Sequence, residues 1–286
     1  MKFALCNEMF EGRPLAEVAE LAAGLGYQGL ELAPFTLARD VRDLPGEELH
    51  RLRRVVEGAG LAVVGLHWLL VSPPDLHIAH PNPLVFERTR SFFLALVETC
   101  AELGGRVMVL GSPKQRTIEP GWDDPATRRR SAEFLRSVLP RAAERDVTIC
   151  LEPLAPEETN FLVTHTEALE FIREIDHPNC RLVLDVKAMS SETTPIPDII
   201  RRSAPHLAHV HANDANRRGP GFGETDFVPI LAALREADYQ GYLSVEVFRF
   251  DPDPETIARR SLEYLQRALA QSEDRGALQD AGASGR

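Results

Sequence analysis

Acidic or histidine residues end several of the short apolar runs in this sequence. Four consecutive runs in its second half end, in order, in Glu152, Asp185, His211 and Glu246. Three carboxylates that meet at one point repel one another unless a cation offsets their charge. Together with one imidazole they form a mostly oxygen shell, which suits Mn²⁺, Mg²⁺ or Co²⁺ better than structural Zn²⁺. These residues therefore predict one bound divalent metal ion, with Mn²⁺ as the first choice and Mg²⁺, Co²⁺ or Zn²⁺ as alternatives.

Such a site needs a scaffold that aims the ends of neighbouring strands at one point. The chain repeats a unit of a short apolar or β-branched run, a polar loop and a segment of helical periodicity. Eight predicted strands lie at residues 3–8, 29–34, 62–68, 106–112, 147–153, 181–186, 207–214 and 242–248. Parallel strands require crossover connections of this kind, and eight units within about 250 residues match a (β/α)8 barrel. An open doubly wound sheet is less favoured, because the loop after the first strand has no GxGxxG phosphate motif.

The expected fold is thus α/β, a single-domain (β/α)8 TIM barrel over residues 1–270. Residues 271–286 are predicted to form a disordered C-terminal tail, because QSEDRGALQDAGASGR is polar and rich in Gly and Ala. Chemistry in such barrels takes place at the C-terminal ends of the strands. Since the fifth to eighth strands are adjacent in a barrel, their terminal acids and histidine should face one site.

Composition and charge narrow the classes of molecule that the protein is expected to bind. The formal net charge of −11 at pH 7 disfavours nucleic acid or an anionic membrane as a partner, because both are themselves negatively charged. The sequence shows neither a signal peptide nor an apolar run long enough to cross a bilayer, so a cytoplasmic location is expected. The four cysteines are scattered without a CxxC pair, which is typical of reduced thiols rather than a disulfide framework.

Several motifs resemble a known family. They are LEPL at 151–154, ETNF at 158–161, LD at 184–185, HVHANDAN at 209–216, GFGETDF at 221–227 and SVEVF at 244–248. Together they resemble the xylose isomerase-like TIM barrel superfamily, in its sugar phosphate isomerase and epimerase branch, and most of all the ketose 3-epimerases. The resemblance covers nearly the whole chain, to about residue 270.

The resemblance implies roles for individual residues. It implies that Glu152, Asp185, His211 and Glu246 bind one divalent metal and that the two glutamates double as an acid and base pair. It further implies that Glu158 and Arg217 bind substrate hydroxyls, that the partner is a small-molecule sugar, and that the chain forms a homodimer or homotetramer.

Such a site supports more than one reaction. A divalent ion that chelates a ketone and the adjacent hydroxyl makes the shared carbon acidic and stabilises an enediolate. Proton transfer through two glutamates on opposite faces gives a metal-dependent sugar epimerase or isomerase, the leading hypothesis, acting on a small keto-sugar or polyol. Loss of a β-leaving group instead gives a lyase or dehydratase acting on an inosose-like or 3-keto-glycoside substrate. An endonuclease IV-type nuclease and a non-catalytic carbohydrate-binding subunit are weaker alternatives.

Other residues leave their roles open. His67 ends the third strand, and either substrate contact or a structural role fits it. The resemblance raises substrate contact for Glu31, whereas Trp68 is expected in the core and Arg116 in a solvated loop. Lys187 follows Asp185 by two residues, and Ala188 stands where many relatives carry a sugar-binding histidine. Lys187 is therefore a replacement substrate ligand, a partner of a site carboxylate, or a loop residue that turns away.

Overall fold

Eight parallel strands close into a barrel in the order of the sequence. The computed structural model describes the backbone of residues 1–283 and the side chains of residues 1–273. The strands are β1 (Lys2–Cys6), β2 (Gly29–Leu32), β3 (Ala62–Leu66), β4 (Val107–Leu110), β5 (Thr148–Leu151), β6 (Cys180–Asp185), β7 (Leu207–Ala212) and β8 (Tyr242–Val245). β1 pairs with β8 as well as with β2, which closes the sheet. The predicted single-domain (β/α)8 barrel is confirmed.

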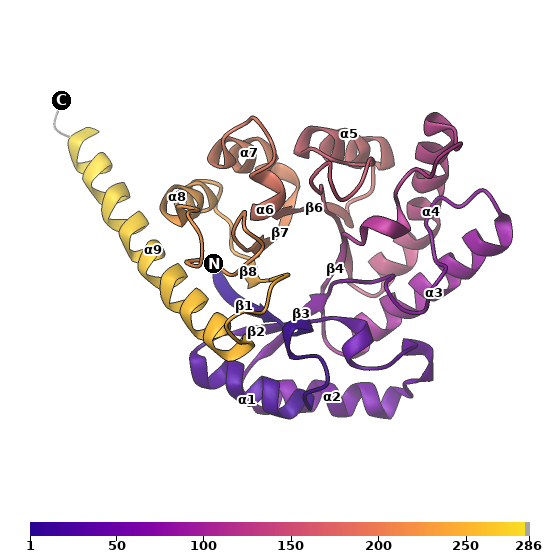
Figure 1. The fold of residues 1–286 in the computed structure, drawn as a ribbon, viewed down its shortest axis with the longest axis horizontal. Coiled ribbons are helices and arrows are strands. Elements are labelled where there is room, and N and C mark those ends of the chain that lie inside the picture. The colour runs from indigo at the N-terminus through magenta and orange to yellow at the C-terminus, as the bar shows by residue number, and fades with distance from the viewer. Residues whose placement is uncertain (284–286) are drawn as a thin grey trace.

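Helices surround the strands (Figure 1). They are α1 (Leu15–Leu25), α2 (Gly46–Gly58), α3 (Pro83–Glu102), α4 (Asp124–Glu144), α5 (His165–Ile175), α6 (Val186–Met189), α7 (Ile196–Ser203), α8 (Phe227–Glu236) and α9 (Pro254–Ala283). Several begin at a residue whose side chain accepts a hydrogen bond from a backbone N–H of the first turn. These N-caps include Asn82, Asp123, Thr164 and Asp226. Each cap satisfies a donor that the helix itself cannot pair, so these boundaries are encoded locally.

The strands bury both of their faces. Apolar side chains between strands and helices form the main core, while Val109, Cys150 and Val183 form a small separate cluster. In β7 the alternation of side chains puts His209 and His211 on one face and Val210 on the other. The four cysteines are buried and free, in agreement with the expectation of reduced thiols.

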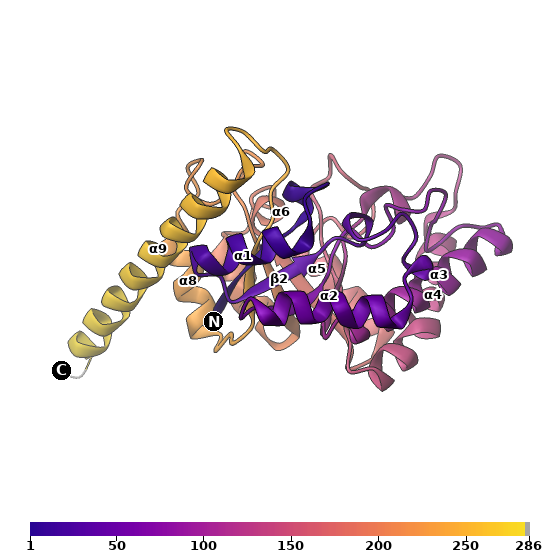
Figure 2. The ribbon, with the colours of Figure 1, turned by 90° about the horizontal axis from the view of Figure 1, so that it is seen from below.

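The last helix departs from the sequence prediction. α9 continues to Ala283, so residues 271–283 are helical where a disordered tail is expected. The segment after residue 270 contains Ala, Leu, Glu, Gln and Arg, which are strong helix formers and extend a helix that has already started. Figures 1 and 2 show this end of α9 extending away from the barrel. Residues 284–286 of the predicted tail lie outside the described residues, and the domain boundary near residue 270 stays a prediction.

The described part of the chain contains no helix with the length and apolar character that a bilayer span requires.

Candidate metal and substrate site

Glu152, Asp185, His211 and Glu246 lie together at the C-terminal ends of β5 to β8. One ligand atom from each lies within 4.8 Å of those of the other three, and all four residues are buried. Asp185 is the last residue of β6 and is paired in register with His211 of β7. Glu152 and Glu246 directly follow β5 and β8. The structure thus brings together the four residues that the sequence singles out.

His211 lies at the centre of this cluster. Its Nδ1 is 3.2 Å from Glu152 Oε1 and 3.0 Å from Glu246 Oε2, and its Nε2 is 3.0 Å from Glu31 Oε1. Burial acts to lower the pKa of His211, but the charges of Glu246 and Glu31 outweigh it and hold that pKa well above its usual value. Burial would likewise raise the pKa of Glu246, but His211 keeps it below its usual value. The site therefore attracts positive charge between its carboxylates.

Asp185 is held by the backbone that follows it. Its Oδ1 accepts a hydrogen bond from the backbone N–H of Ala188 at 2.7 Å, which makes Asp185 the N-cap of α6. Its Oδ2 accepts a hydrogen bond from Asn213 Nδ2 at 2.5 Å. Burial raises the pKa of Asp185 to about 6, although Lys187 acts in the opposite direction. These contacts fix the orientation of the carboxylate before any ligand binds.

These four candidate ligands, Glu152, Asp185, His211 and Glu246, which we call the metal quartet, fit a divalent metal ion. Three carboxylates and one imidazole supply the mostly oxygen donor set that Mn²⁺ and Mg²⁺ prefer. Metal-binding histidines usually hydrogen-bond a carboxylate through their second ring nitrogen, which orients the ring. Glu31 stands in that position behind His211. A metal ion held by the quartet would replace the proton that the carboxylates around His211 now favour.

Gly111 lies directly against Glu152. A Cβ atom added at Gly111 would stand 1.6 Å from Glu152 Oε2, so Gly111→Ala must displace that carboxylate. We expect this substitution to weaken Mn²⁺ binding by about 10- to 100-fold, the usual cost of disturbing the groups that orient a metal ligand. Isothermal titration calorimetry measures the affinity. Gly24→Ala on α1 is the control, because no atom beyond its own stretch of the helix lies within 4 Å of its added Cβ, and equal affinities for both variants would contradict the prediction.

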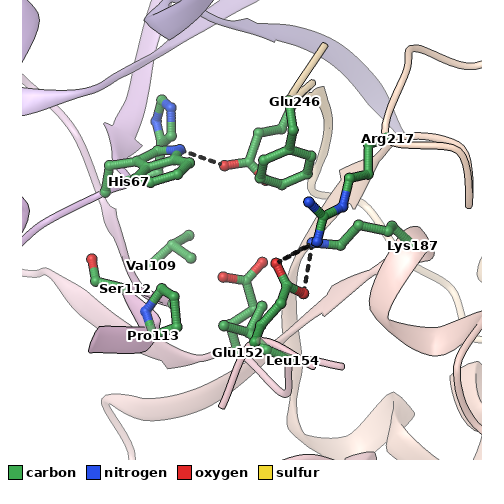
Figure 3. A pocket seen from close by; sticks show the side chains of 13 residues that line it. His67, Val109, Ser112, Pro113, Glu152, Leu154, Lys187, Arg217 and Glu246 are labelled. Carbon is green, nitrogen blue, oxygen red and sulfur yellow. Dashed lines mark hydrogen bonds and ion pairs between the residues drawn. The ribbon is translucent and has the colours of Figure 1, made fainter. Parts of the chain in front are cut away.

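A cavity of ≈180 Å³ opens beside the metal quartet. Glu152 and Glu246 approach it from opposite sides, and Lys187 and Arg217 lie together on one flank (Figure 3). His67 also lines it, while its Nε2 is 3.0 Å from Glu8 Oε2. His67 therefore makes a structural contact with Glu8 and also faces the cavity, and its contact with substrate stays a prediction.

Lys187 forms an ion pair on the cavity wall. Its Nζ is 2.9 Å from both carboxylate oxygens of Glu158 and lies 4.1 Å from the centre of the Phe248 ring. Arg217 Nη2 is 3.8 Å from Glu158 Oε1. Burial acts to lower the pKa of Lys187, but the charge of Asp185 and the bond to Glu158 raise it above its usual value. Of the three alternatives, the structure shows Lys187 paired with a site carboxylate, and a side chain turned away into the loop is excluded.

Replacing Lys187 with Met should reveal the strength of this pair. Breaking a buried ion pair costs roughly 3–5 kcal/mol, and we expect about 2 kcal/mol here because Glu158 is partly exposed. Urea unfolding of the parent, Lys187→Met, Glu158→Gln and the double variant would isolate the coupling free energy. A coupling below about 0.5 kcal/mol, the usual additivity error, would show that the pair contributes nothing.

Glu31 does not lie where the resemblance implies. It is fully buried and does not line the cavity. Its Oε2 is 2.7 Å from His209 Nε2, and its Oε1 is 3.0 Å from His211 Nε2. Burial would raise its pKa, but the two histidines hold it well below its usual value. Glu31 thus contacts two histidines of β7 rather than the cavity, a place that suits an orienting group for His211.

Two further residues of the site, Trp68 and Glu8, were not predicted from the sequence. Trp68 is expected in the core, yet its Nε1–H donates a hydrogen bond to Glu246 Oε1 at 2.9 Å, and it lines the cavity. Its backbone φ of 54° is unfavourable for a bulky residue, and such conformations cluster at functional sites. Glu8 lies two residues after the end of β1. The rule that functional residues follow the C-terminal ends of barrel strands, applied to this first strand, would have identified it.

Arg116 corrects a further expectation. It is buried rather than solvated, and none of its guanidinium nitrogens has a hydrogen-bond partner among the described residues. Burial lowers its pKa to about 10, although Glu152 and Glu158 act in the opposite direction. No local pattern in the sequence distinguishes this arginine from a solvated one.

The sequence and the fold both match known proteins. Residues 19–268 match the family model described as xylose isomerase-like TIM barrel. A D-psicose 3-epimerase from Ruminiclostridium cellulolyticum is 27% identical over 233 residues, which cover 80% of this chain and 76% of that protein. A 3-dehydro-D-guloside 4-epimerase from Escherichia coli is 28% identical over 177 residues, 60% of this chain and 68% of that protein. A solved L-ribulose 3-epimerase structure matches the fold with a TM-score of 0.85 at 22% identity, over 97% of both chains.

Proposed function

Because the chain belongs to the xylose isomerase-like TIM barrel family, we propose that it is a metal-dependent sugar epimerase acting on a small keto-sugar. The observation that carries this proposal is the placement of Glu152 and Glu246. Both belong to the potential metal-binding quartet, and they face the cavity from opposite sides (Figure 3). The names of its relatives, which are epimerases of ketoses and of a 3-keto-glycoside, support the same reaction class.

The two glutamates would carry the proton transfers. A divalent ion bound to the quartet would supply Lewis acidity, which polarises a ketone and its adjacent hydroxyl. Glu152 or Glu246 then removes the proton from the carbon beside the ketone, on the face that it approaches. The other glutamate donates a proton to the opposite face and inverts the carbon. Such positioned general bases and acids typically contribute about 10²–10⁴-fold to the rate.

The surrounding residues prepare these groups. Trp68 holds one oxygen of Glu246 by its indole N–H, which fixes the orientation of this carboxylate toward the cavity. Glu158, Lys187 and Arg217 form a charged flank of the cavity. They would bind the hydroxyl groups of the sugar and so orient the reacting carbon between the glutamates.

Incubation of the Mn²⁺-loaded protein with D-psicose, D-tagatose, L-ribulose and 3-keto-glucosides tests the reaction class. We expect NMR to show the epimer at a carbon beside the ketone for at least one compound. A dehydrated product in place of an epimer would assign the site to a lyase. No conversion of any of these compounds would overturn the proposal for this substrate class.

A further inference from the structure

A second, larger cavity opens beside the metal pocket. It measures ≈650 Å³, against ≈180 Å³ for the inner cavity. Trp68 and Phe248 line both cavities. Their ring centres are 6.2 Å apart and their planes are inclined by 55°. The two cavities therefore meet across this pair of aromatic rings.

The outer cavity has exposed apolar walls. Phe35, Val71 and Phe250 line it together with Trp68 and Phe248. Val71 is 39% and Phe250 44% exposed, and they are two of the three large hydrophobic residues that stand exposed in the described chain. Exposed apolar residues that gather at one place mark a binding surface more often than scattered ones do. We call this cavity, with Phe35, Val71, Trp68, Phe248 and Phe250, the aromatic groove.

The rim of the aromatic groove is polar. Glu8, Glu11, Arg39 and Ser72 line it beside the aromatic rings. Sites for small ligands combine apolar and aromatic walls with a few polar groups that fix orientation. Aromatic faces with charged and hydroxyl groups around them suit a ring that has an apolar face and polar edges. A pyranose ring and an aryl ring both present such a face.

The sizes of the two cavities indicate how a substrate would be divided between them. Pockets for drug-sized ligands measure about 300–1,000 Å³, so the smaller inner cavity of ≈180 Å³ suits one small sugar unit next to the metal quartet. A substituent of this sugar unit that extends past Trp68 and Phe248 would enter the aromatic groove. Trp68 stands between the two cavities, because it donates a hydrogen bond to Glu246 beside the inner cavity and also lines the groove.

We propose that the aromatic groove binds the aglycone ring of a keto-glycoside, so that the substrate is a glycoside rather than a free monosaccharide. The inference rests on the proposed epimerase function and adds the substrate class to it. The aglycone is a ring with an apolar face, joined to the reacting keto-sugar through its glycosidic oxygen, and it packs against Phe35 and Phe250.

Matched substrates test the aglycone site. The Mn²⁺-loaded enzyme is assayed with methyl 3-keto-β-D-glucoside, phenyl 3-keto-β-D-glucoside and 3-keto-cellobiose, which differ only in the aglycone. We expect kcat/KM for at least one ring-bearing substrate to exceed that for the methyl glycoside by about tenfold or more, because a well-packed aromatic contact contributes up to about this factor. Whichever of the phenyl glycoside and 3-keto-cellobiose has the higher kcat/KM shows whether the groove prefers an aryl or a sugar aglycone.

Groove variants assign the preference to these residues. Phe250→Ser and Phe35→Ala should remove the preference for the ring-bearing substrate and leave the rate with the methyl glycoside unchanged. Leu84→Ser is the matched control, because Leu84 is 79% exposed and does not line the groove. Retention of the preference in both groove variants, or an equal loss for all three substrates, would overturn the inference.

A binding experiment separates this inference from the reaction itself. Calorimetry with the unreactive phenyl β-D-glucoside and methyl β-D-glucoside measures the groove without turnover. Stronger binding of the phenyl compound that is lost in Phe250→Ser supports the groove even if no keto-sugar is converted, a result that refutes the epimerase proposal alone. Equal binding of both compounds overturns the groove. If Phe250→Ser instead splits a dimer in light scattering without changing glycoside binding, the groove is a subunit contact and the inference fails.

Discussion

Glu152→Gln and Glu246→Gln are each expected to stop epimerisation while one epimer, and only one, still exchanges its proton with solvent. Each variant lacks one of the two bases, so only the epimer whose proton faces the remaining carboxylate can be deprotonated. Conversion between epimers should fall by about 10²–10⁴-fold, the usual contribution of a general acid or base. Each substitution also removes one of the three carboxylates of the quartet, so Mn²⁺ content is measured for each variant and exchange is compared at equal metal content.

NMR in D₂O reads this result directly. Each purified epimer is incubated with each variant, and loss of the proton signal beside the ketone is followed. Opposite epimers should exchange in the two variants, and Glu20→Gln, on the exposed face of α1, should behave as the parent. Exchange of the same epimer in both variants would show that a single base serves both faces, which contradicts the assigned roles.

Asp185→Asn is expected to remove the stabilisation that Mn²⁺ gives to the parent protein. A ligand that binds only the folded state at about 100 times its dissociation constant raises the free energy of unfolding by about 2.7 kcal/mol. In the parent, the added metal also offsets the repulsion between three buried carboxylates. Thermal unfolding with chelator and then with Mn²⁺ measures the difference.

Asp43→Asn is the matched control for this experiment, since Asp43 is an exposed residue away from the quartet. It should keep the full Mn²⁺-dependent rise in melting temperature. The same rise in Asp185→Asn would mean that the metal binds elsewhere or that Asp185 is only the N-cap of α6.

The strand pattern was enough to predict the barrel and the residues of the metal quartet. Parallel strands carry their chemistry at one end, so the position of an acid at the end of each apolar run places it without knowledge of any contact. Glu152, Asp185, His211 and Glu246 are all found this way because each lies within one residue of the end of its strand.

Contacts between distant loops could not be predicted in this way. Lys187 reaches Glu158 because β6 ends at Asp185 and a short helix follows, whereas a continuing strand would have aimed it differently. Arg116 is buried and Trp68 reaches Glu246 through the packing of loops that are far apart in the sequence. Glu31 lies near the end of its strand, as the candidate metal ligands do. Its carboxylate instead contacts the rings of His209 and His211 and does not line the cavity. Such pairings depend on the closed barrel rather than on any local pattern.

Metal-dependent proton exchange is the most direct test of the proposed activity. The parent protein, freed of metal with a chelator, is incubated in D₂O with the keto-sugar or keto-glycoside that it converts best, without and then with Mn²⁺. We predict no deuterium beside the ketone without metal, and incorporation into both epimers once Mn²⁺ is added. Equal incorporation in the metal-free protein, or epimerisation without any incorporation of deuterium, would contradict a metal-assisted proton transfer by Glu152 and Glu246.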